Sequence, residues 1–382
     1  WFFESVQDEF KKIPGSPVAY WVSEKITDLY VASPKAGDVS KAAVGLQTGD
    51  NDRFMRYWYE IDHNTYSDKF TKTEDTLNAT IKWVPYNKGG AYRKWYGNRE
   101  FVVNWAEDGK EIKDMKPKSV VRSPSLYFKE SVTWSEITSS WKSFRFNESG
   151  SISDVKGQSA YYSSKEKLIS ALCWLNSNVV EFLTKIQNPT LSFQSGDYKN
   201  LPLPVLGTSV VSLGKSAISI CEKDWNAFES SSRFLTSPLH CLSDSLETSF
   251  EVYCSEAKES TLRLKSLEEE INEIAVSKFE LQSDIKTEVY LEQLTLKVNP
   301  AYRYGVKGTE EECNIRFRED TMAELVSYAI GCMMGRYSLD ELGLIYANSG
   351  NEGFDASRYT KFPADDDGII PLTDKEWFAD DA

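Results

Sequence analysis

The strongest constraint on the fold is a heptad pattern in the second half of the chain. Apolar or small residues recur there at alternating steps of four and three, which places them on one face of a helix. They are Leu246, Phe250, Tyr253, Ala257, Ser260, Leu264, Leu267, Ile271 and Ile274. A seam of this length, with Ser260 as its one polar defect, predicts a helical hairpin or a coiled-coil arm. We interpret its charged outer face, including Glu268–Glu270, as solvated.

The residues before the seam have the patterns of a β-rich domain. Short runs of β-branched and aromatic residues alternate with turn residues. We predict strands at Glu100–Trp105, Ser125–Phe128, Val132–Ile137 and Ser143–Phe146. Lys165–Ile186 then repeats its apolar residues at helical spacing, which predicts one helix that ends at Asn188-Pro189.

A proline-rich connector divides the chain. Leu201-Pro202-Leu203-Pro204 is typical of a rigid extended segment, and we place a domain boundary just after it. The predicted fold class is α+β, with three parts. They are a β-rich mixed domain over 1–205, a helical spacer over 206–298 and a helical, acidic C-terminal part over 299–382.

Charge and composition limit the kinds of partner. The formal net charge of −14 argues against a surface generally coated by nucleic acid. The charge is uneven, because residues 41–130 hold 16 Lys and Arg against 13 Asp and Glu, whereas residues 340–382 hold 11 acids against 3 bases. A local nucleic-acid face in the first region is compatible with this asymmetry. The chain begins at Trp1 rather than Met, so we expect it to be part of a longer protein.

Composition also predicts a compartment. There is no apolar run of about 20 residues and no signal-peptide pattern, so we predict no membrane span. The six cysteines are scattered, with no CxxC pair, which is typical of reduced cysteines. We therefore predict a cytoplasmic protein.

One stretch, Ile81–Asn98, interleaves cations with aromatic residues around Gly89-Gly90. Asn87–Gly90 predicts a turn, because glycine adopts positive φ angles at little cost. The residues leave two interpretations open. Either the turn gathers cations and aromatic faces on one surface that holds a phosphate backbone and stacks on bases, or the aromatics pack in a sheet core while the Lys and Arg side chains are solvated.

Catalytic motifs are absent from the sequence. The two histidines, His63 and His240, have no nucleophile or metal-ligand pattern nearby, and there is no GxxxxGK[ST] or strand-linked GxGxxG. Asp365–Gly368 lacks the spacing of a calcium-binding EF-hand loop and is better interpreted as a solvated acidic loop. We therefore predict no active site, no metal site and no cofactor site in this chain.

An ordered series of motifs resembles PglX, the adenine-specific DNA methyltransferase of BREX phage-defence systems. The series begins with GLQTGDNDRFMRYW (Gly45–Trp58), KWVPYNKGGAYRKWYGN (Lys82–Asn98), EFVVNW (Glu100–Trp105) and SVTWSEI (Ser131–Ile137). It continues with NPTLSFQSGDYKNLPLP (Asn188–Pro204), EKDWNAFESSSRF (Glu222–Phe234), ELVSYAIGCMMGRYSLD (Glu324–Asp340) and KFPADDDGIIPLTDKEWF (Lys361–Phe378). Together these motifs cover nearly the whole chain in order, which is more specific than any one of them.

The resemblance implies the C-terminal portion of such an enzyme, with a target recognition domain near 15–205 and the heptad region as helical spacer. Adenine-N6 methyltransferases hold the flipped adenine with an Asn/Asp-Pro-Pro-Tyr/Phe motif, and the nearest strings here, Asn188-Pro189-Thr190 and Asn299-Pro300-Ala301, do not match it. The glycine motif that binds S-adenosylmethionine is also missing. We therefore expect S-adenosylmethionine to serve the parent enzyme and this chain alone not to methylate.

The resemblance makes three clusters candidates for contact with double-stranded DNA. In Gln47–Arg56, the side chains of Gln47, Thr48 and Asn51 are candidates for base or backbone hydrogen bonds, and Arg53 and Arg56 for phosphate or base contacts. The alternative is that Asp50 and Asn51 only shape the turn while Arg53 pairs with an acid.

The second and third clusters follow along the chain. In the central stretch Lys88, Arg93 and Lys94 are phosphate candidates, Tyr86 is a stacking candidate, and Trp83 and Trp95 are assigned mainly to packing. In Trp134–Arg145 the candidates are Ser135, Lys142 and Arg145. We interpret Gln194 and Asp197 as structural.

Three hypotheses about function remain. The first is sequence-specific duplex recognition on behalf of the N-terminal methyltransferase domain. The second is a protein-interaction module, in which the acidic end and the heptad arm dock other BREX proteins or a DNA-mimicking phage inhibitor. The third, an independent nuclease, is weak because no metal-binding carboxylate cluster stands out.

Overall fold

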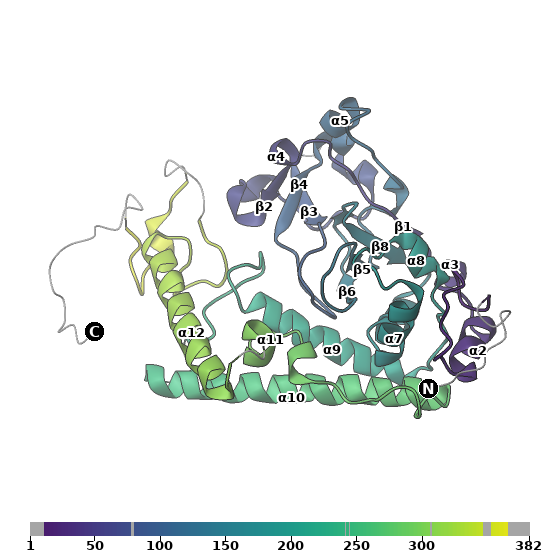
Figure 1. Ribbon diagram of the computed structural model, residues 1–382. Helices are drawn as coiled ribbons and strands as arrows, with labels where there is room; N and C mark the ends of the chain where they lie inside the picture. The colour runs from purple at the N-terminus through teal and green to yellow at the C-terminus, as the bar shows by residue number, and fades with distance from the viewer. Residues whose placement is uncertain are drawn as a thin grey trace. The chain divides into compact units, whose positions relative to one another are not determined.

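The chain has an α+β fold, as the sequence predicts. The computed structural model describes residues 11–77, 80–240, 242–243, 245–305, 308–346 and 353–365. These residues form two compact units: unit 1 lies within 1–225 and 254–313, and unit 2 lies within 226–253 and 314–382. Among the described residues, all the strands lie before α6 (Lys165–Leu175), among short helices, and only helices follow β8 (Gly157–Tyr161), in the chain order that the colours of Figure 1 show. The division into a recognition domain, a spacer and a C-terminal part stays a prediction. The two compact units divide the chain by its packing, which does not test a division by function.

Two four-stranded sheets form the β-rich part of unit 1. The first has the order β1 (Lys41–Ala43), β8 (Gly157–Tyr161), β5 (Ser131–Ser135) and β6 (Phe144–Asn147), and all its pairs are antiparallel. The second has the order β2 (Met55–Tyr57), β4 (Phe101–Asn104), β3 (Trp83–Asn87) and β7 (Ile152–Ser153). Its β3–β7 pair is parallel, and β2 is an edge strand.

The core of the second sheet explains where the expected strands form. Apolar side chains from β3, β4, β7 and the neighbouring segments interlock there. They are Leu46, Phe54, Val84, Tyr86, Val103, Trp105, Ile112, Tyr127, Phe128 and Ile152. Three of the four predicted strands are present with shifted ends, at Phe101–Asn104, Ser131–Ser135 and Phe144–Asn147. The fourth, at 125–128, is wrong: Pro124–Leu126 is a 3₁₀ turn that carries Tyr127 and Phe128 into this core.

Helices complete unit 1. Within the described residues they are α2 (Glu24–Ala32), α3 (Ala36–Val39), α4 (Asn51–Phe54), α5 (Ala106–Asp114), α6 (Lys165–Leu175), α7 (Asn178–Gln187), α8 (Ser195–Asn200), α9 (Ser209–Asn226) and α11 (Pro300–Tyr304). The single helix expected over 165–186 is two helices. Ser177 caps α7, because its hydroxyl accepts a hydrogen bond from the Val180 N–H at 3.5 Å.

The heptad region forms α10 (Leu246–Lys278), one uninterrupted helix of 33 residues. In the part that belongs to unit 1, Leu264, Leu267 and Ile271 of the predicted seam are buried. The expectation of a solvated outer face is wrong at Glu268, which is also buried. Helix α10 contacts α7 through the Asn178 N–H, which donates to Asn272 Oδ1 at 2.9 Å. A coiled-coil pairing of this helix stays a prediction.

Unit 2 has a small aromatic core. It contains the first turns of α10 and most of α12 (Glu310–Met333). Phe234, Tyr328, Cys332 and Tyr337 pack together in it. Of the acidic end, 340–382, the stretches 347–352 and 366–382 lie outside the described residues, and with them most of the Asp365–Gly368 loop. No helix among the described residues is long and apolar enough to cross a membrane.

Candidate nucleic-acid interface

The loop 47–56 leads from the core into the edge strand β2 and holds exposed polar side chains. Gln47 is anchored by backbone hydrogen bonds to Val120 at 3.0 and 2.9 Å. Asp50 caps the short α4, where its Oδ1 accepts from the Arg53 N–H at 3.0 Å. Thr48 is buried and donates to Asn51 Oδ1 at 2.7 Å. The loop is therefore rigid, and it presents the amides of Gln47 and Asn51 to solvent.

The two arginines of this loop, Arg53 and Arg56, differ in exposure and in how the protein holds them. Arg53 is exposed and forms an ion pair with Glu111 at 2.7 Å, with both side chains more than half accessible. Exposed pairs of this kind stabilise a fold by about 0–1 kcal/mol, so a phosphate can compete for the guanidinium. Arg56 is half-buried and donates to the backbone carbonyls of Met55 and Asp52. The turn-shaping role of Asp50 and the acid partner of Arg53, both foreseen as the alternative, are thus present.

The segment 116–120 borders the same loop, although the sequence did not single it out. The Gln47 Nε2 atom donates to the Lys118 carbonyl at 3.3 Å, and Gly49 adopts φ +80 against the backbone of Lys118. Lys116 and Lys118 are exposed, and no ion pair holds either within the described part of the chain. The run KDMKPK was the available signal, but only the β-bridge between Gln47 and Val120 places it beside the loop.

Lys88, Ser135 and Lys142 are half-buried and held by the protein. Lys88 pairs with Asp154 at 3.2 Å. The Ser135 hydroxyl donates to the Gly90 carbonyl at 2.8 Å. Lys142 donates to the carbonyls of Thr190 and Leu191 at 3.0 and 3.3 Å, and burial lowers the pKa of its ammonium group. Lys88 lies directly after β3 and Ser135 bonds to that segment, whereas Lys142 is held by residues 190–191.

Besides Thr48, four further candidates are buried. Tyr86 donates to the Leu46 carbonyl at 3.1 Å and to the Asp154 carboxylate, and burial raises the pKa of its phenol. Arg93, Lys94 and Arg145 have exposed fractions of 4%, 6% and 0%. Since a duplex touches accessible groups, these four side chains are less suited to contact DNA than the exposed residues of the loop 47–56.

Tyr86 is buried in the core of the second sheet and Arg145 lies in β6, whereas Arg93 and Lys94 belong to the long connection between β3 and β4. Gly89 and Gly90 adopt positive φ angles, +82 and +138, but the expected turn over Asn87–Gly90 is wrong: Asn87 ends strand β3, and residues 88–90 leave the strand without a turn. The strand that pairs with β3 begins only at Phe101, so residues 88–100 extend away from the sheet and pack against the helices. Trp83 and Trp95 are buried, which confirms their assignment to packing.

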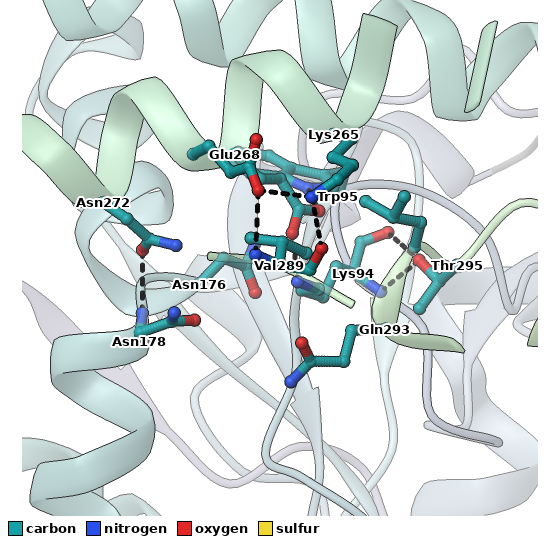
Figure 2. A network of polar contacts seen from close by, with 12 residues as sticks. Lys94, Trp95, Asn176, Asn178, Lys265, Glu268, Asn272, Val289, Gln293 and Thr295 are labelled. Carbon is teal, nitrogen blue, oxygen red and sulfur yellow. Dashed lines mark hydrogen bonds and ion pairs between the residues drawn. The ribbon is translucent and has the colours of Figure 1, made fainter. Parts of the chain in front are cut away.

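A network of charged groups holds this connection in place. Lys94 forms an ion pair with Glu268 of α10, and the Trp95 Nε1–H donates to the same carboxylate at 2.7 Å (Figure 2). Arg93 pairs with Asp224 of α9 at 3.4 Å and donates to the Thr295 carbonyl at 3.2 Å. We call Arg93, Lys94, Asp224, Glu268 and Thr295 the buried joint.

Further hydrogen bonds satisfy the charged groups of the buried joint. The Asp224 carboxylate accepts from the N–H groups of Lys297 and Val298 at 2.9 and 3.0 Å, while burial raises its pKa. Arg145 donates to the Arg93 carbonyl at 3.3 Å, and burial lowers the pKa of its guanidinium to about 10. The cations of the joint are therefore compensated by protein groups, as buried charges must be.

Two remaining assignments concern Gln194 and Asp197. The Asp197 Oδ2 atom accepts from the Gln194 N–H at 2.7 Å at the start of α8, which confirms their structural role. Within the described ranges, no group of three or more His, Cys, Asp or Glu side chains is arranged to hold a metal ion.

Comparison with known proteins gives relatives along the whole chain. No family model matches. The chain is 37% identical over 388 residues to the adenine-specific methyltransferase BrxX of Escherichia coli O9:H4 (strain HS), a match that covers 100% of the chain and 31% of that relative. It is 35% identical over 397 residues to the adenine-specific methyltransferase PglX of Lacticaseibacillus casei (strain Zhang), which covers 99% of the chain and 31% of that relative. The chain thus spans about a third of the length of these relatives, and the resemblance to PglX is confirmed.

Proposed function

We propose that this chain is the target-recognition portion of a PglX-type adenine-specific DNA methyltransferase and that it binds duplex DNA through the loop 47–56. The observation that carries the proposal is the rigid loop with exposed amides and an exposed arginine, in a chain similar throughout to two adenine-specific methyltransferases. The S-adenosylmethionine-dependent reaction then belongs to the full-length cytoplasmic enzyme. The missing Asn/Asp-Pro-Pro-Tyr/Phe motif supports a non-catalytic role for this chain.

The hydrogen bonds of the loop suit base recognition. Asn and Gln can hold adenine by two hydrogen bonds in the major groove, and Arg can hold guanine. The Thr48 hydroxyl already donates to Asn51 Oδ1, which fixes the amide and directs its Nδ2 group to an external acceptor. Gln47 uses Nε2 internally and keeps Oε1 for an external donor. The two amides are thus oriented in advance, which lowers the entropy cost of binding.

Cations beside the loop suit phosphate contacts. Lys116 and Lys118 are exposed at its border, and Arg53 is held only by an exposed ion pair. Phosphate contacts fix the register of a protein on DNA without carrying sequence information. We therefore assign Lys116 and Lys118 to phosphates, and Arg53 to a phosphate or a base.

The double substitution Arg53→Glu with Lys118→Glu tests this interface. We expect the affinity of the chain for a mixed-sequence duplex to fall about tenfold or more, and the slope of log affinity against log salt to shrink by about one per lost phosphate contact. The matched control is Lys223→Glu on α9, which reverses a cation that is 80% exposed and pairs weakly, at 3.9 Å, with Glu256 of α10. Equal losses in both variants would contradict the interface.

A specificity test uses the full-length enzyme. Exchange of residues 40–205 for the matching segment of a relative should change the DNA motif that is methylated in cells. An unchanged motif in methylome sequencing would contradict the recognition role.

Docking of another BREX protein or of a DNA-mimicking inhibitor is the second candidate function. It is favoured by Val326, Ile330 and Met333, which repeat at helical spacing on α12 of unit 2 and are exposed. An apolar stripe of this kind is typical of helix-mediated docking. The substitution Ile330→Lys should then release a partner protein without changing DNA affinity, and retention of every partner would count against this function.

A further inference from the structure

Three aromatic rings at the edge of the second sheet form a ladder from the core to solvent. Phe101 of β4 packs against the core, and the ring of Tyr57 on β2 lies 4.7 Å from it. The ring of Tyr59 stacks on Tyr57 at 5.3 Å with an interplanar angle of 5°. Tyr57 is 40% exposed and Tyr59 is 56% exposed. The ladder (Phe101, Tyr57, Tyr59) therefore ends in a ring with an accessible face.

The backbone fixes the last ring of the ladder. Strand β2 ends at Tyr57, whose N–H donates to Glu60 Oε2 at 2.7 Å, and Trp58–Glu60 is a 3₁₀ turn. Trp58 is buried and places its ring edge-on to Tyr59, with 5.8 Å between the centroids. Tyr59 is thus supported from two sides, and little side-chain freedom remains to be lost on binding.

The charges around the ladder restrict its ligand. Burial raises the pKa of the Tyr59 phenol, and Tyr57 and the nearby carboxylates of Glu60 and Glu100 raise it further. A phosphate group would be repelled by these carboxylates. A neutral planar group that stacks on the ring meets no such repulsion, and nucleobases stack on aromatic side chains in this way.

We propose that the ladder binds one unstacked nucleobase of a DNA duplex held by the loop 47–56. The inference rests on the proposed DNA-recognition function. Both faces of every base are covered inside an intact duplex, so only a base outside the stack can meet Tyr59. Enzymes that act on a base extrude it from the duplex, and this opens the stack beside the target. The position of the ladder, directly after the loop in the chain, fits a base near the recognised site.

Duplexes with and without an unpaired base test the proposal. One short duplex carries a single bulged 2-aminopurine, whose fluorescence falls when it stacks on an aromatic ring, and the other is fully paired. We expect the chain to bind the bulged duplex about five- to a hundredfold more tightly, the range that one base–aromatic stack provides, and to quench the probe. Tyr59→Ala should abolish both the preference and the quenching, whereas Tyr59→Phe should keep both.

Two further variants separate stacking from other causes. Tyr59→Leu retains an apolar side chain without a ring, so it should behave like Tyr59→Ala. Tyr290→Ala removes a tyrosine that is 50% exposed in a different segment and should leave the preference unchanged. Thermal unfolding of each variant controls for loss of fold.

The outcomes also distinguish this inference from the proposed function. Equal affinity for the two duplexes, or a preference that Tyr59→Ala leaves intact, overturns the ladder site, while the loop can still bind DNA as measured with the Arg53 and Lys118 variant. A chain that binds neither duplex overturns both. The chain could instead bind an aromatic or proline-rich peptide, lose that binding in Tyr59→Leu and show no preference between the duplexes. This result would assign the ladder to a protein partner and overturn the proposal that it binds a nucleobase.

Discussion

The connection 88–100 and the loop 47–56 contain the same kinds of residue but place their charges in opposite environments. In the connection, Arg93 and Lys94 are buried against Asp224 and Glu268. In the loop, Arg53 lies at the surface and pairs with an exposed acid. Cations interleaved with aromatic residues therefore do not by themselves indicate a nucleic-acid face. What distinguishes the two regions is whether a distant acid is brought to the cation and buried with it.

The largest expected effect comes from breaking the buried joint. Lys94→Met leaves the Glu268 carboxylate buried, with the Trp95 N–H still donating to it. We expect the free energy of unfolding to fall by about 3–5 kcal/mol, because an uncompensated buried charge is strongly destabilising. Denaturant titration of the purified chain measures this change.

A second substitution and a control sharpen the result. Glu268→Gln added to Lys94→Met should recover most of the loss, because it removes the charge and keeps an acceptor for Trp95. Lys185→Met breaks an exposed pair with Glu181 on α7 and should cost about 0.5 kcal/mol or less. A similar cost for Lys94→Met would show that the joint is not a buried charge pair. Charge reversal of Arg93 and Lys94 would lower DNA binding through unfolding, so it cannot test a DNA face.

An intermediate effect is expected from Gly49→Ala in the loop. Gly49 adopts φ +80, and an added Cβ would lie 2.8 Å from the backbone carbon of Lys118. We expect a loss of about 1–3 kcal/mol in unfolding free energy, together with weaker DNA binding as the loop separates from segment 116–120. Gly207→Ala is the matched control, since it also has positive φ but nothing within 4 Å of the added Cβ. Equal effects of Gly49→Ala and Gly207→Ala on DNA affinity would show that DNA binding does not depend on the geometry of the loop.

The sequence predicted local features well and distant contacts poorly. The positive φ angles of Gly89 and Gly90, the structural roles of Asp197 and Trp95, and the α+β class follow from patterns within short windows of sequence. The partner of Lys94 lies 174 residues away, and no window contains both. For the same reason Glu268 was interpreted as solvated: its position on the outer face of the heptad was correct for an isolated helix, but the connection 88–100 covers that face.

In the candidate interface, too, the sequence identified residues with local signals and missed those that distant contacts bring together. Gln47, Asn51 and Arg53 could be selected from the sequence because the loop signals are local. Lys116 and Lys118 could not, because only the bridge between Gln47 and Val120 brings them to the loop. No local pattern distinguishes Tyr57 and Tyr59, since exposure at a sheet edge depends on which strand lies outermost.

The smallest expected effect concerns pH and a carboxylate at the end of the connection. Burial raises the pKa of Glu100, although Arg93, Lys297 and Arg145 oppose the shift. A carboxyl group whose pKa is higher in the folded state favours folding while it is protonated, and this contribution is lost as the pH rises through the folded-state pKa. Glu100→Gln should therefore match the wild type below the ordinary pKa of Glu and be more stable at neutral pH, by at most about 1 kcal/mol. Denaturant titrations of both proteins at the two pH values measure the difference. If the advantage of the variant instead appeared on the acidic side, Glu100 would be stabilised as a carboxylate, and its burial would resemble the compensated charges of the joint.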